Sequence, residues 1–339
     1  MGLGARARAW RRWVDPLTAS ILGLLVLGLL LPARGAVGDA LDGVRDGAVV
    51  LLFLLYGARM PSVELLRAMR RVRVQGSMLV ATFVVFPVLG LAVQLVPDAV
   101  LPPEVRRGLL YLSILPSTVQ SSVVLTGEAR GDVPAALTGA TVSNVLGVLA
   151  TPLLAIGLLG AGGTGGAGSV LLPALGMLLA PFVVGQLAQP FVGAWLRAHP
   201  RLTRVTDRAT ILLVVYTSVS EAQASGAWDD VTPAVLAALL GVCAVLLAVM
   251  LGLTWWGGGR LGLDRAERIA LLMCGSKKSA ATGLPMSTVL FAPAVAAGLA
   301  LPVIAYHQLQ LTVCALLARR LARRPPPLLA KIRANGCSQ

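Results

Sequence analysis

The chain has 339 residues, of which 56% are hydrophobic and 13% are charged, and its mean hydropathy is +0.81. This composition excludes an ordinary soluble protein, in which about a quarter of the residues are charged. The net charge of +14 is accompanied by only 5% aromatic residues and by no RNA- or DNA-binding signature, so we expect no nucleic-acid partner. The composition is that of an all-α polytopic membrane protein.

Ten hydrophobic segments, bounded by charges or by Gly and Pro, are long enough to be predicted as transmembrane helices. The first five are residues 16–31, 41–58, 76–96, 107–126 and 134–159. The second five are residues 169–189, 209–227, 233–256, 269–290 and 293–318. The cysteines form no pattern typical of a disulfide or metal framework, so we expect no cofactor other than a coupling ion.

Lysine and arginine concentrate in every second connection between these segments. If the N-terminus is cytoplasmic, nearly all of them fall on the cytoplasmic side, as the positive-inside rule expects. The exceptions are Arg34, Arg45, Arg106, Arg107, Lys277 and Lys278. We therefore expect both termini in the cytoplasm and a basic tail, residues 319–339, that contacts anionic membrane lipid.

The predicted helices divide into two halves, residues 1–160 and 169–318. Five helices per half is an odd number, so the second half must be inverted relative to the first. The Gly-rich residues 160–168 between them are typical of a flexible linker. A shift of 159 residues, which aligns Ser117 with Ser276, superimposes the fourth predicted helix on the ninth and the fifth on the tenth.

The fourth predicted helix is interrupted by a polar run, LPSTVQSS. Pro116 lacks a backbone N–H and frees carbonyl groups in the turn before it. The polar side chains that follow are Ser117, Thr118, Gln120, Ser121 and Ser122. Serine and threonine can simply satisfy a proline kink by bonding back to the helix, but so dense a polar run favours a binding site.

The ninth predicted helix is interrupted at the corresponding place by CGSKKSAATGLP. Its polar residues include Ser276, Lys277, Lys278 and Ser279. Lys278 lies about 14 Å into the predicted helix, at 1.5 Å per residue, which is near the limit of snorkelling. A buried lysine can neutralise an anionic substrate, replace a bound cation or release a proton. Paired breaks in the two halves of a membrane protein point to a transporter's binding site.

Other polar residues in the predicted helices are further candidates. Glu221 is an intramembrane carboxylate, and we expect it to pair with one of the two lysines or to line a wet vestibule. Thr141 and Asn144 are spaced so that both can face the first break. His307 and Gln308 in the tenth helix bind a ligand or hydrogen-bond a neighbouring helix.

The chain resembles the bile acid:sodium symporter superfamily, and within it the SBF-like, YfeH-type branch. The resemblance covers nearly the whole chain and is carried by LPSTVQSSVVLTGEARGDVPAALTGATVSNVLGVLATPLL, CGSKKSAATGLPMSTVLF and AYHQLQLTVCALLARR. It implies ten helices in two inverted five-helix repeats, with the broken helices 4 and 9 crossing at mid-membrane. Helices 3–5 and 8–10 would form a core domain, and helices 1, 2, 6 and 7 a panel domain.

The resemblance also implies a set of ion ligands. Sodium-coupled members of the superfamily take their ligands from the fourth-helix break, from the fifth helix, and from a Glu with a nearby Gln in the ninth. Ser121, Ser122 and Thr141 match the first two groups, which makes them candidate sodium ligands. Met273 and Lys277 fall near the positions of the Glu and the Gln, so a lysine replaces part of the cation-binding chemistry.

These features predict a secondary active transporter of the bacterial inner membrane. We expect a sodium-coupled symporter of an organic anion, either bile-acid-like or a small carboxylate, that works by alternating access. The alternatives are a proton-coupled or uncoupled transporter in which lysine fills a cation site, and a non-transporting membrane regulator on the same fold. We do not expect an enzyme, because no nucleophile–base set is visible.

Overall fold

The computed structural model describes residues 16–60, 71–160, 172–173 and 175–323. All regular secondary structure in these residues is helical. The predicted linker, the predicted lipid-binding part of the tail and the N-terminal arginines lie largely or wholly outside the described residues. Five of the described helices are long and apolar enough to cross a membrane: Val72–Val93, Val133–Leu159, Gly176–Ala198, Pro233–Arg260 and Pro293–Ala322.

Each predicted segment coincides with a helix or with a run of consecutive helices. The first half contains α2 (Pro16–Leu30), α3 (Ala36–Arg59), α5 (Val72–Val80), η1 (Ala81–Val85), α6 (Phe86–Val93), α7 (Pro103–Ser113), α8 (Gln120–Glu128) and α9 (Val133–Leu159). The second half contains η3 (Leu175–Leu179), α11 (Ala180–Ala198), α12 (Pro200–Ser225), α13 (Pro233–Arg260), α14 (Arg265–Gly275), α15 (Ala280–Leu290) and α16 (Pro293–Ala322). The largest differences are in the sixth predicted segment, whose helix continues to Ala198, and in the seventh, whose helix begins at Pro200.

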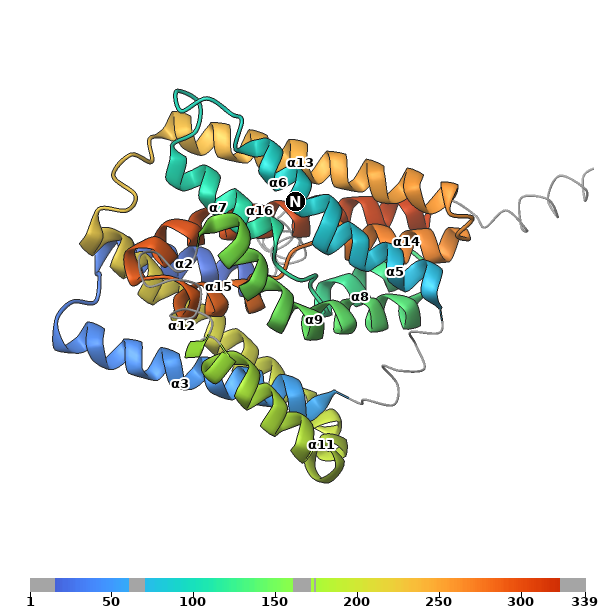
Figure 1. Cartoon of the computed structure of the whole chain (residues 1–339), viewed down its shortest axis with the longest axis horizontal. Coiled ribbons are helices and arrows are strands. Elements are labelled where there is room, and N and C mark those ends of the chain that lie inside the picture. The colour runs from blue at the N-terminus through green and yellow to red at the C-terminus, as the bar shows by residue number, and fades with distance from the viewer. Residues whose placement is uncertain (1–15, 61–70, 161–171, 174, 324–339) are drawn as a thin grey trace, which may run out of the picture.

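Helices α2, α3, α11 and α12 pack on one another and form what we call the α3–α11 group. In Figure 1, α3 and α11 lie along the lower side of the molecule. Two glycines allow these helices to touch: a Cβ on Gly57 would collide with the backbone of Phe182, and one on Gly185 with the backbone of Leu54. Close approach of two helix backbones therefore requires glycine at both positions.

The remaining helices, α5 to α9 and α13 to α16, form what we call the broken-helix group, because it contains both interrupted helices (Figure 1). Two of its helix starts are capped by acidic side chains: Asp132 accepts from the amide of Ala135, and Asp264 and Glu267 form a capping box. Arg71 joins two of these starts by ion pairs to Asp132 (2.6 Å) and Glu267 (2.8 Å). The hydrogen bond to Asp132 raises the pKa of Arg71 above its ordinary value.

The two groups meet along α12, which packs against α15 and α16. Trp228, just after α12, donates its indole N–H to the carbonyl of Ala297 in α16 at 3.2 Å. The second half of the interrupted ninth helix, α15, and the helix that follows it, α16, therefore face the α3–α11 group.

Candidate functional site

The first break separates α7 from α8, and polar side chains of α9 satisfy its backbone. Ser143 accepts from the amide of Ser117 (3.1 Å), and Asn144 donates to the carbonyl of the same residue (2.6 Å). Thr151 donates to the carbonyl of Ile114 at 3.0 Å. The fifth predicted helix thus supplies the donors and acceptors that the proline break leaves unpaired.

The second break separates α14 from α15 and is satisfied in the same way by α16. The Gln310 amide accepts from the backbone N–H of Lys278 (2.8 Å) and donates to its carbonyl (2.7 Å). The same Nε2 lies 2.9 Å from Nδ1 of His307. Because an amide nitrogen only donates, this histidine nitrogen is the acceptor. Tyr306 donates its hydroxyl proton to the carbonyl of Ser276 at 2.8 Å.

The two breaks contact each other directly. Three of the hydrogen bonds that cross between them, each given with its donor first, are Ser117 Oγ to Cys274 O (2.6 Å), Ser122 Oγ to Met273 O (2.9 Å) and Ser279 N to Pro116 O (2.8 Å). The hydroxyl of Ser276 instead bonds back to Leu272 in its own helix at 2.6 Å. Ser117 and Ser276 therefore differ in role although their positions in the two halves match.

Asn144 links both breaks through one side chain. While its Nδ2 donates to Ser117, its Oδ1 accepts from the hydroxyl of Thr282 in α15 at 2.9 Å. Thr282 lies in α15, which packs against α12 of the α3–α11 group. The crossing point therefore adjoins the interface between the broken-helix group and the α3–α11 group.

The two adjacent lysines have very different surroundings, although they are 0% and 1% exposed. Lys278 Nζ donates to three backbone carbonyls, those of Thr82 (2.8 Å), Ser113 (2.6 Å) and Leu115 (2.7 Å). Within the described residues, the hydrogen-bond acceptor of Lys277 Nζ is Ser121 Oγ alone, at 3.3 Å. An ammonium group has three donors, so Lys278 is satisfied and Lys277 can bind a further acceptor.

Hydroxyl groups cluster beside Lys277 at the start of α8. Thr118 Oγ1 lies 2.8 Å from Ser121 Oγ and 3.1 Å from Ser122 Oγ. These oxygens are of the hard type that alkali cations prefer, and they equally suit the oxygens of an anion when they donate. Hydroxyls and one ammonium group together make a small polar site inside an apolar surrounding.

Most of the predicted site residues come together at this crossing. They are Ser117, Thr118, Ser121, Ser122, Asn144, Ser276, Lys277, Lys278, Ser279 and His307. Gln120 is exposed at the start of α8, and Thr141 is half-buried on α9, where its neighbour Ser143 makes the contact with the break. The buried amide of Gln308 has no hydrogen-bond partner among the described residues.

Glu221 is not paired with either lysine in this structure. It lines a cavity of about 20 Å³ together with Asp42, Arg45 and Thr288. Arg45 is itself ion-paired with Asp42 at 2.5 Å. The carboxylate therefore lies at the interface between α3, α12 and α15, and its lining of a wet vestibule stays a prediction.

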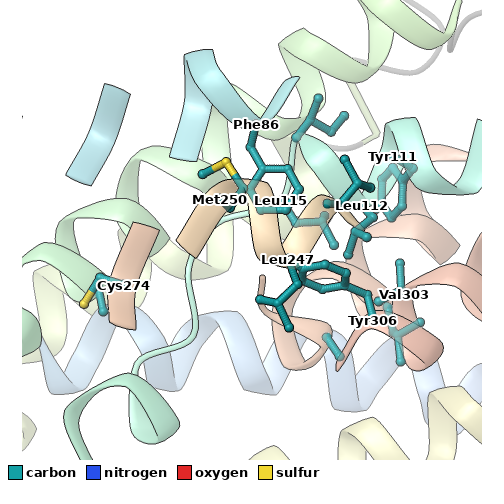
Figure 2. Close-up of a cluster of buried hydrophobic side chains, with 14 of the residues drawn as sticks. Phe86, Tyr111, Leu112, Leu115, Leu247, Met250, Cys274, Val303 and Tyr306 are labelled. Carbon is teal, nitrogen blue, oxygen red and sulfur yellow. The ribbon is translucent and has the colours of Figure 1, made fainter. Parts of the chain in front are cut away.

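The residues at the crossing that the sequence patterns missed include Thr82, Phe86 and Ser113. Phe86 belongs to the buried cluster of Figure 2, which also contains Met250 and Leu115, and its ring centre is 4.3 Å from Lys278 Nζ. Thr82 and Ser113 contribute only backbone carbonyls, which no side-chain pattern reports. The sequence does contain one signal of these free carbonyls. Pro87 lacks a backbone N–H, so the turn that holds Thr82 lacks one helical hydrogen-bond donor.

The sequence is similar along most of its length to known membrane transporters. The profile described as the SBF-like CPA transporter family (DUF4137) matches residues 15–323. "Uncharacterized protein PA2026" of Pseudomonas aeruginosa is 41% identical over 311 residues, which cover 91% of this chain and 93% of that protein. "Putative symporter YfeH" of Escherichia coli is 36% identical over 324 residues, covering 94% and 96%. "Sodium/bile acid cotransporter 7" of Rattus norvegicus is 25% identical over 267 residues, covering 78% of each chain.

Proposed function

Because the chain belongs to the SBF-like CPA transporter family, we propose that it is a secondary active transporter of an organic anion that works by alternating access. We place it in the bacterial inner membrane with ten transmembrane helices and both termini in the cytoplasm. The observation that carries the proposal is a buried lysine, Lys277, with unused donors beside the hydroxyls of a second broken helix.

We further propose that the two halves are inverted repeats whose broken helices cross. The shift of 159 residues that aligns the breaks also aligns Thr151 with Gln310. Thr151 of α9 bonds the first break, and Gln310 of α16 bonds the second. Two equivalent positions that each hydrogen-bond the backbone of a break support a structural repeat, even though the residue types differ.

In this proposal the broken-helix group is the core domain and the α3–α11 group is the panel domain. Polar residues lie on both sides of the crossing, along the interface between the groups. Toward the predicted outer side is the cavity with Glu221 and Arg45, and toward the cytoplasm is the ion pair of Arg59 with Asp207 (3.4 Å). Rocking of one group against the other would open one side and close the other.

The substrate class follows from the chemistry of the site. Lys277 supplies a positive charge, and no carboxylate of the described residues lies within ion-pair distance of it. A buried charge without a partner is costly, so a bound anion stabilises it. The name of the similar sodium/bile acid cotransporters suggests bile-acid-like anions as the first compounds to test, and small carboxylates carry the same charge.

Two modes of coupling are supported by different observations. Sodium coupling through Ser121, Ser122 and Thr141 is suggested by the similar sodium cotransporters. The contact of the Lys277 ammonium with Ser121 favours a second mode, in which the lysine occupies the cation position and coupling is to protons or absent.

The test is flux into proteoliposomes that contain the purified chain. Bile acids and short carboxylates are first screened for thermal stabilisation of the protein, and those that stabilise it are then measured as labelled substrates. Uptake driven by an imposed sodium gradient supports sodium coupling, and uptake driven by a pH gradient alone supports the second mode. Binding without flux under any gradient would contradict transport and support a non-transporting regulator.

A further inference from the structure

The carbonyls around Lys278 have the character of a cation site that the chain fills with its own side chain. We propose that the carbonyl oxygens of Thr82, Ser113 and Leu115 form a monovalent-cation site, and that a free cation binds there once the lysine side chain is removed. This inference concerns cation binding and does not depend on the transport activity proposed above.

The Thr82 carbonyl is available because its own helix cannot use it. In the π-helical turn η1, the amide of Phe86 donates to Ala81, five residues earlier, instead of to Thr82. The next amide along the chain would belong to Pro87, which has no N–H. The turn and the proline together leave the Thr82 oxygen without a helical donor, and Lys278 Nζ takes that place at 2.8 Å.

The Ser113 carbonyl is available for a parallel reason at the end of α7. The donor three residues later would be Pro116, which again lacks an N–H. The donor four residues later is Ser117, whose amide is used by Ser143 at 3.1 Å. Leu115 lies in the break itself. These oxygens are at the carbonyl end of α7, where the helix dipole favours a positive charge.

The site is complete for an ammonium-sized cation. Three acceptors at 2.6–2.8 Å match the three donors of the ammonium group, and the face of Phe86 lies 4.3 Å away as a further source of cation attraction. Rings of backbone carbonyls also replace the hydration shell of alkali cations in ion channels. The same oxygens can therefore bind ammonium or an alkali cation when the lysine is shortened.

The experiment measures the thermal unfolding of full-length Lys278→Ala in detergent. Ammonium, potassium or sodium chloride is compared at equal ionic strength with N-methylglucammonium chloride, whose cation is too large for the site. We expect at least one small cation to raise the Tm of this variant by about 4 °C. We expect the wild type, which keeps the Lys278 ammonium at the three carbonyls, to show no such response to ammonium or potassium.

A second variant tests the need for a positive charge. Lys278→Gln has a neutral donor that reaches the same region and blocks a free ion, so we expect a lower Tm than the wild type and no response to cations. A folded Lys278→Ala whose Tm is the same in all salts would overturn the proposal. If Lys278→Ala cannot be recovered folded in any salt, the Tm of Lys278→Gln is the test. A Tm of Lys278→Gln equal to that of the wild type would show that a neutral donor suffices, and would overturn the proposal.

Discussion

Adjacent residues with the same side chain carry different tasks in the second break. Lys278 is held by three carbonyls from two other helices and has no donor left for a ligand. Lys277 points to the hydroxyls of α8 and makes one long hydrogen bond of 3.3 Å. Because Lys278 is fully hydrogen-bonded, it fixes the backbone of the break, and this keeps the Lys277 ammonium in the binding site.

Replacement of Lys277 by methionine should weaken anion binding and leave the fold intact. The methionine side chain has a similar length and no charge, so the packing is retained and the electrostatic attraction is lost. We expect the affinity for the most strongly stabilising anion to fall about 10- to 100-fold, as for a charge-assisted hydrogen bond. Thermal shift titration measures it, with Lys277→Arg as the charge-retaining control, and an unchanged affinity for Lys277→Met would place the anion elsewhere.

Replacement of Asn144 by leucine should destabilise the crossing. The change leaves the Ser117 carbonyl and the Thr282 hydroxyl without their present partner. Each buried unpaired group costs about 1–3 kcal/mol, so we expect a loss of about 2–4 kcal/mol in the free energy of unfolding. The matched control is Thr141→Val on the same helix, for which a clearly lower Tm would contradict the difference in roles between these two residues.

At the scale of the helices, most of the elements could be predicted from the sequence and most of the contacts could not. The length of each hydrophobic run and the Pro, Gly or charged residues at its ends predicted each segment, because these features depend on the local sequence alone. The polar runs after Pro116 and before Pro285 predicted the breaks because buried backbone needs partners nearby. The choice of partner depends on how helices cross, so neither the bond from Ser117 to α14 nor the carbonyls of Thr82 and Ser113 followed from pattern.

Replacement of Gly57 by alanine should separate α3 from α11. The added Cβ would collide with the backbone of Phe182, which cannot turn aside as a flexible side chain can. We expect a loss of about 1–3 kcal/mol in stability, typical of overpacking. The Tm is compared with that of Gly47→Ala, also on α3, where a Cβ meets nothing within 4 Å. Equal Tm values for the two variants would contradict the close approach of these helices.

At the scale of the whole molecule, charge sets the orientation and packing sets the interfaces. Basic residues on one side of the predicted membrane predict that this face is cytoplasmic. On that face Arg71 ties the starts of α5, α9 and α14 together through Asp132 and Glu267. Composition alone predicted a membrane protein, and the resemblance implied that α3 groups with α11 and α7 with α16, whereas the residues that make these contacts required the structure.

The predicted orientation can be tested with reporter fusions. We expect a fluorescent protein fused after Arg323 to be fluorescent, and alkaline phosphatase fused there to be inactive, because that end is predicted to be cytoplasmic. Phosphatase fused after Val100, in the predicted outer connection, should be active. The reverse pattern of activities would contradict the orientation.

The ammonium of Lys278 cannot be diluted away, because it is covalently part of the chain. Its local concentration at the three carbonyls is fixed by the length of a side chain and not by the surrounding medium. Occupancy of the three-carbonyl site by the Lys278 ammonium is therefore independent of the salt concentration of the medium. The three carbonyls at the crossing therefore need no free cation from the medium.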